Sequence, residues 1–105
     1  MDKAEAIKIA ERYVGVINQK FPIEKAILFG SFAKGINHKD SDIDLAIVFN
    51  SVEDIIDRQI ELMKLRTDDD LLIEPHPFLL NDFHASNPMV YEILKTGIEI
   101  TNFAA

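Results

Sequence analysis

The sequence contains no cysteine among its 105 residues. This absence excludes disulfides, thiolate metal sites and cysteine nucleophiles, and it fits a reducing compartment. No apolar run approaches the roughly 18 residues that a membrane-spanning helix needs, and the start MDKAEAIKIAER is too charged for a secretory signal. We therefore expect a cytoplasmic protein without membrane attachment.

Basic residues are also scarce. Lys and Arg number 11 against 18 Asp and Glu, which gives a net charge of −7. Broad contact with a nucleic-acid backbone depends on a surplus of Lys and Arg, so direct nucleic-acid binding is not expected. An acidic chain favours basic partners or metal ions instead.

The chain lacks repeats, low-complexity tracts and linker-like segments. Its length suits one modest core and is too short for a catalytic domain with a separate substrate domain. The sequence therefore predicts a single domain over residues 1–105.

Hydrophobic periodicity and capping residues predict alternating helices and strands. Asp2 with Glu5 resembles a cap pair, and Asn87 followed by Pro88 is typical of a helix start. Helices are expected over 3–20, from Ser51 onward and from Pro88 to just before Gly97, and strands over 24–29, 42–49, 71–76 and 98–100. This order predicts an α+β fold with a mixed sheet of about four strands flanked by helices.

The helix that begins at Ser51 has apolar residues at helical spacing. The stripe expected to face the core consists of Val52, Ile55, Ile56, Ile60 and Met63. Leu62 and Leu65 lie off this stripe and are candidates for contact with a partner, although packing against neighbouring helices is the simpler account.

Two aspartates, Asp42 and Asp44, lie near the start of the strand 42–49. Because side chains alternate along a strand, both point to one face, about 7 Å apart, while Ile43, Leu45 and Ile47 point to the core. Two like charges on one face are costly unless a cation lies between them. Carboxylate oxygens suit Mg²⁺. The alternative is that both acids are simply solvated.

Gly30 and Ser31 stand between the strands 24–29 and 42–49. A short helical turn through Lys34, closed by Gly35, would bring backbone N–H groups and the Ser31 hydroxyl to the end of the sheet where the aspartates lie. Such a turn can hold phosphate oxygens, and glycine leaves room for a triphosphate. The alternative is an ordinary turn, in which these residue types are common.

Gly30-Ser31, ten further residues and Asp42-Ile43-Asp44 together resemble the GS-x10-D-x-D signature of the DNA polymerase β-like nucleotidyltransferases. The short chain is similar to their minimal members, the MNT domains. The resemblance implies a palm-like fold in which Gly30 and Ser31 hold the β- and γ-phosphates of ATP. It also implies that Asp42 and Asp44 bind one or two Mg²⁺ ions.

A third carboxylate normally completes this family's site. Glu74, on the strand 71–76, is the best candidate, although Asp is the commoner residue there. The run Asp68–Asp70 is the alternative and is more typical of a solvated loop. His76 lies two residues beyond Glu74 and is a candidate for substrate contact. Lys34 and Lys39 are candidates for phosphate contact, or ordinary surface lysines.

The resemblance implies Mg²⁺-dependent attack of an acceptor hydroxyl on the α-phosphoryl group of ATP, with pyrophosphate as the leaving group. Minimal members are typically paired with an all-helical HEPN toxin, which they neutralise by transferring AMP to it, by binding it, or both. We therefore expect a protein adenylyltransferase that acts as an antitoxin in complex with such a partner. The alternatives are a binding module without turnover and a small-molecule nucleotidyltransferase.

Overall fold

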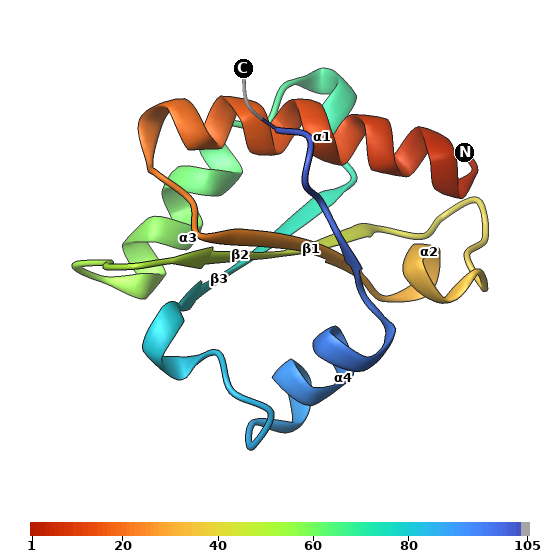
Figure 1. The fold of residues 1–105 in the computed structure, drawn as a ribbon. Coiled ribbons are helices and arrows are strands. Elements are labelled where there is room, and N and C mark those ends of the chain that lie inside the picture. Colours follow the sequence, from red (N-terminus) through yellow and green to blue (C-terminus); the bar gives the residue numbers. More distant parts are fainter. Residues whose placement is uncertain (104–105) are drawn as a thin grey trace.

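The computed structural model describes residues 1–103, apart from the side chain of Asp69. Its elements are α1 (Lys3–Lys20), β1 (Lys25–Phe29), α2 (Ser31–Lys34), β2 (Ile43–Phe49), α3 (Ile55–Lys64), β3 (Ile73–Leu79), α4 (Pro88–Thr96) and β4 (Ile98–Glu99), with 3₁₀ turns at Asp68–Asp70 and Leu80–Asp82 (Figure 1). No helix within these described residues is long and apolar enough to cross a membrane.

The strands form one mixed sheet in the order β3-β2-β1-β4. β2 runs parallel to β3, whereas β1 is antiparallel to both β2 and β4. α1 and α3 lie over one face of the sheet and α4 lies on the other (Figure 1). The expected α+β fold with a mixed four-stranded sheet is therefore confirmed.

The main core lies between the sheet and α1. Leu45 and Ile47 of β2 are fully buried there against Tyr13 and Ile17 of α1. A smaller cluster on the opposite face joins Ile27, Ala46 and Ile93 of α4. The alternation along β2 thus sends its large aliphatic side chains to the α1 face, as predicted.

Capping side chains fix the ends of two helices as expected. The Glu5 N–H donates to Asp2 Oδ1 at 2.8 Å, and the Met89 N–H donates to Asn87 Oδ1 at 2.9 Å. Gly97 follows α4 but has an ordinary backbone conformation with φ −75°. Glycine is needed at this position because a Cβ would lie 2.4 Å from the Ile93 carbonyl oxygen.

The prediction for α3 is wrong in its start and in the buried face of the helix, although Val52, which precedes the helix, packs against the core as predicted. The helix begins at Ile55, not Ser51, because Asp54 caps it by accepting hydrogen bonds from the N–H groups of Ile56 and Asp57. Leu62 is fully buried, and Leu65 packs against the core. The apolar residues left exposed on the helix are Ile55, Ile56, Ile60 and Met63.

Contacts with neighbouring elements explain which face of α3 turns inward. The Tyr13 hydroxyl donates to the Leu62 carbonyl, and Gln59 Nε2 donates to the Pro75 carbonyl at 3.0 Å. Arg66, just beyond the helix, donates to the Ile73 carbonyl at 3.0 Å. These last two bonds occupy carbonyls on the outer edge of β3, where Pro75 also lacks an N–H, so this edge is poorly suited to pairing with another strand.

Leu62→Ala tests the corrected orientation of α3. Loss of this buried side chain should lower the free energy of unfolding by about 2–5 kcal/mol. The matched change Ile60→Ala, at a side chain that is 46% exposed, should cost about 0.5 kcal/mol or less. Urea denaturation of both variants measures the difference, and equal costs would contradict the observed orientation.

The buried phenol of Tyr13 should contribute to the unfolding of the protein at alkaline pH. Burial raises the pKa of its phenol above the ordinary value of 10.0. The folded state therefore favours the neutral phenol, and the stability it contributes is present below about pH 10 and is lost as the pH rises further. The free energy of unfolding of Tyr13→Phe should fall less steeply with pH than that of the wild type above about pH 10. At pH 7 the variant should be less stable by about 1 kcal/mol, because the hydrogen bond of the hydroxyl is lost. Urea denaturation across this range checks the slope, and equal slopes would contradict the assignment.

Candidate active site

Strand register brings two of the three candidate acids, Asp44 and Glu74, together. Asp44, near the start of β2, is the partner of Glu74 in the parallel pairing of β2 with β3. In the antiparallel pairing with β1, Asp44 is the partner of Phe29, which directly precedes Gly30. Asp44 is half-buried and Glu74 is exposed. Two carboxylates thus face one patch of the sheet from neighbouring strands, as predicted.

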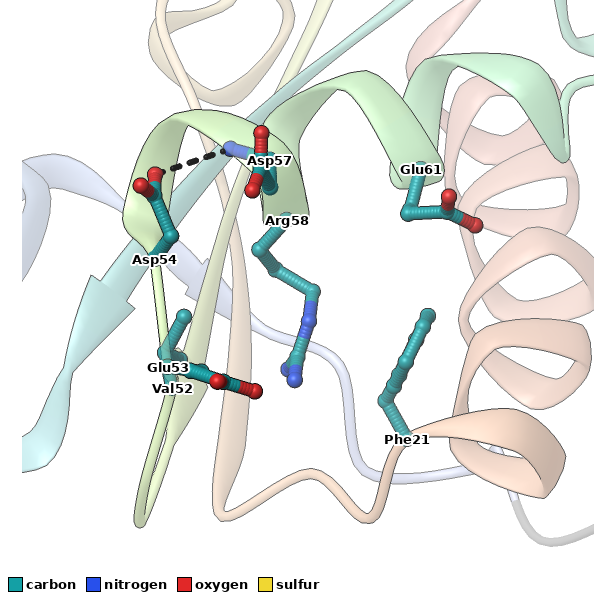
Figure 2. A pocket seen from close by; sticks show the side chains of 7 residues that line it. All are labelled: Phe21, Val52, Glu53, Asp54, Asp57, Arg58 and Glu61. Atoms are coloured by element: carbon teal, nitrogen blue, oxygen red, sulfur yellow. Dashed lines mark hydrogen bonds between the residues drawn. The ribbon is translucent and has the colours of Figure 1, made fainter.

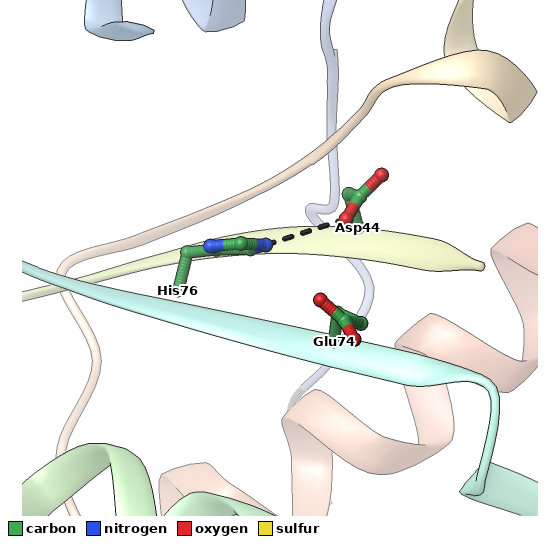
Figure 3. Close-up of side chains that lie close together, drawn as sticks. All are labelled: Asp44, Glu74 and His76. Carbon is green, nitrogen blue, oxygen red and sulfur yellow. Dashed lines mark hydrogen bonds and ion pairs between the residues drawn. The ribbon is translucent and has the colours of Figure 1, made fainter.

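His76 completes a three-residue group with these acids (Figure 3). Its Nε2 lies 3.3 Å from Asp44 Oδ1, and its ring lies 5.2 Å from the ring of Phe29. One ligand atom from each of Asp44, Glu74 and His76 lies within 4.8 Å of the other two. Two carboxylates and an imidazole are a donor set that fits a divalent cation, whose charge would also relieve the repulsion between the acids.

The other acids differ in their placement. Asp42 precedes β2, is exposed and stands outside the three-residue group. Asp70 is buried, accepts hydrogen bonds from Thr67 and pairs with Arg12 at 3.2 Å, so it stabilises the 3₁₀ turn. Asp68 is exposed and also outside the group, and the side chain of Asp69 lies outside the described residues.

Gly30 connects β1 to α2 in a conformation that other residues rarely adopt. Its φ and ψ are 80° and −153°. A Cβ at this position would lie 2.5 Å from Asp44 Oδ2, so the carboxylate lies directly against the glycine backbone. Gly30 has no side chain to cap α2, and the N–H groups of the first turn therefore remain available to another acceptor.

The model of the family described as polymerase beta, nucleotidyltransferase, matches residues 11–103. The chain belongs to this nucleotidyltransferase family. A crystal structure from Sulfolobus solfataricus, itself only provisionally assigned as a nucleotidyltransferase, is similar with a TM-score of 0.69 and 20% identity, over 92% of this chain and 80% of that one. At this identity the likeness supports the fold alone. Among curated proteins, none matches this chain significantly.

The two candidate lysines of this nucleotidyltransferase are both exposed. Lys34, a candidate phosphate contact, is exposed at the end of α2 and pairs with Glu92 of α4 at 3.8 Å. Lys39 is exposed in the loop before β2. The structure therefore brings Lys34 toward α4 and gives neither lysine a contact with the acidic group.

A hollow of about 380 Å³ lies at the other end of the sheet (Figure 2). It is lined by Phe21, Val52, Glu53, Asp54, Asp57, Arg58 and Glu61. The Arg58 guanidinium stacks over Phe21 and Phe49, with 4.0 Å and 4.5 Å to the ring centroids. Asp44 stands near the start of β2 and this hollow lies beyond its end, so the hollow belongs to a separate feature.

The sequence indicated His76 only as a candidate for substrate contact and did not single out Phe29. Spacing places His76 on the same face as Glu74, but the contact with Asp44 depends on the pairing of β2 with β3. Phe29 is half-buried and resembles an ordinary strand residue. No local signal distinguishes it, because its contact with His76 spans two strands that are not adjacent in the sheet.

Gly30→Ala tests the close approach of Asp44. The added methyl group should displace this carboxylate and, with the unfavourable φ, lower the free energy of unfolding by about 1–3 kcal/mol. Gly35→Ala is the matched control, since Gly35 also has a positive φ of 75° but has no atoms within 4 Å of the place where its methyl group would lie. The difference between the two variants in urea denaturation and nucleotidyl transfer isolates the contact, and indistinguishable variants would contradict it.

Proposed function

We propose that this nucleotidyltransferase transfers AMP from ATP to a hydroxyl group of a partner protein. The observation that carries the proposal is the pair of opposed carboxylates, Asp44 and Glu74, beside Gly30. A strand pair that only stabilised the fold would gain nothing from two like charges in register. The same pair is suited to a cation that neutralises a triphosphate.

Asp42, Asp44 and Glu74 would hold Mg²⁺ in this proposal, and His76 lies at the same site. The ion would supply charge stabilisation as negative charge develops around the α-phosphorus. Gly30, Ser31 and the first turn of α2 would bind the β- and γ-phosphates through backbone N–H groups and the Ser31 hydroxyl. Lys34 would contribute a further phosphate contact by leaving its exposed pairing with Glu92, which is a weak interaction.

The chemical step is a single in-line displacement. The acceptor oxygen forms a bond to the α-phosphorus, the bond from that phosphorus to the bridging oxygen breaks, and pyrophosphate leaves. Glu74 is the exposed member of the group and would accept the proton of the hydroxyl. Positioning and electrostatics supply the catalysis, and no covalent intermediate with the protein forms.

The partner in this proposal is an all-helical toxin of the HEPN type, as the family resemblance implies, and the protein acts as its antitoxin. The exposed stripe of α3, formed by Ile56, Ile60 and Met63, supports a protein partner because it is apolar surface without cover among the described residues. The adjoining Asp57 and Glu61 and the net charge of −7 would suit a basic surface.

The second candidate is a binding module that neutralises the same partner without turnover. The same stripe on α3 favours it, because binding by occlusion needs only contact area. The two candidates make different use of Asp44, which is essential for transfer and lies on β2 rather than on α3.

Asp44→Asn separates the candidates. The protein and its helical partner are incubated with α-labelled ATP and Mg²⁺, and the intact mass of both chains is measured. The wild type should add AMP to the partner, and Asp44→Asn should reduce the rate by about a hundredfold or more, because several kcal/mol of electrostatic stabilisation are lost. Asp68→Asn removes the same charge outside the group and should leave the rate unchanged.

Two results would count against AMP transfer as the way in which the protein neutralises its partner. If no chain gains AMP although a stable complex forms, the binding module is favoured. If Asp44→Asn still protects against the partner's toxicity, catalysis is not the mechanism of neutralisation.

A further inference from the structure

We propose that His76 is itself a metal ligand and makes this site prefer Mn²⁺ to Mg²⁺. The inference rests on the metal site of the proposed function and goes beyond it, because the family resemblance implies carboxylate ligands alone. It assigns to His76 the role of a residue that determines metal specificity.

The position of the imidazole is the first argument. His76 and Glu74 are two residues apart on β3, so their side chains project from the same face of the sheet. The side chain of His76 is 26% exposed and that of Asp44 is 29% exposed, which leaves both open to an ion from solution. Figure 3 shows one ring nitrogen directed toward the Asp44 carboxylate, and this atom is Nε2.

The distances between donors are the second argument. His76 Nε2 and Asp44 Oδ1 are 3.3 Å apart. Adjacent ligands of an octahedral ion with bonds of about 2.1 Å are about 3 Å apart. The pair is therefore spaced almost as two ligands of one ion would be, and Glu74 offers a third oxygen within 4.8 Å of both.

The packing of the ring is the third argument. The Phe29 ring lies 5.2 Å from the His76 ring with 60° between their planes. Phe29 is half-buried on β1, so the imidazole packs against a side chain of the sheet and does not stand free in solvent. A ligand held in place before the ion arrives loses less conformational entropy on binding.

Donor chemistry then selects the ion. Mg²⁺ prefers oxygen ligands, whereas imidazole nitrogen suits first-row transition ions. Mn²⁺ accepts both carboxylate oxygen and imidazole nitrogen. The described donor set therefore favours Mn²⁺ over Mg²⁺.

The test is binding of Mn²⁺ alone, without nucleotide, followed by electron paramagnetic resonance. The variants are His76→Gln and, as the matched control, His84→Gln, in which an exposed histidine outside the group is changed in the same way. Gln keeps a hydrogen-bond donor for Asp44 but removes the imidazole nitrogen. Urea midpoints establish that each variant is folded.

The wild type and His84→Gln should show coupling between bound Mn²⁺ and an imidazole ¹⁴N nucleus in pulsed spectra. His76→Gln should lose this coupling and bind Mn²⁺ about tenfold or more weakly, while its Mg²⁺ affinity, measured by competition, should change much less. The ratio of Mn²⁺ to Mg²⁺ affinity should therefore fall.

Coordination by oxygen alone in the wild type, or an unchanged affinity ratio in His76→Gln, would overturn the inference and leave His76 as a hydrogen-bond partner of Asp44. A failure of this inference can be distinguished from a failure of the proposed function. AMP transfer with Mg²⁺ but without nitrogen coupling would refute only the role of His76. Nitrogen coupling without AMP transfer to any protein would refute only the proposed function.

Discussion

The parallel pairing of β2 with β3 is the constraint on which the rest of the site depends. It places Asp44 opposite Glu74, and alternation along β3 then adds His76 to the same face. A shift of one residue in this register would turn Glu74 toward the core face. The buried side chain of Ile73 on β3 opposes such a shift, because it would leave the core face as Glu74 entered it. Core packing therefore determines the spacing of the polar groups.

The antiparallel pairing of β1 with β2 adds the second half of the site. It brings the end of β1 beside Asp44, where Gly30 turns the chain into α2 without a side chain in the way. The acidic group and the uncapped first turn of α2 thus meet at one end of the sheet. This region combines two facing carboxylates with a backbone conformation that favours glycine, features that the fold itself does not need and that are typical of sites arranged for function.

Local signals predicted most of the fold, and long-range contacts decided the rest. The caps at Asp2 and Asn87 and the alternation of β2 depend on neighbours in the sequence, so they could be predicted from it. The face of α3 could not be predicted, because Ile56-Ile60-Met63 and Leu62-Leu65 both have helical spacing. Contacts from α1 and β3 select the second set. Similarly, the predicted strand 71–76 led us to expect Glu74 beside both aspartates, which is right for Asp44, but Asp42 stands outside the group.

α4 covers part of the sheet face that carries Asp44, Glu74 and His76, and it limits approach to them from that side. α4 packs on this face through Ile93, which contacts the β1 residue Ile27 and Ala46 of β2. Glu74, on the edge strand β3, is exposed. Access to the site is therefore greatest on the side of β3, and α3 with its exposed apolar stripe covers the outer edge of that same strand. α3 lies over the opposite face of the sheet, so a partner bound to its apolar stripe would reach Glu74, the residue proposed to accept the proton of the hydroxyl, only around the edge strand β3.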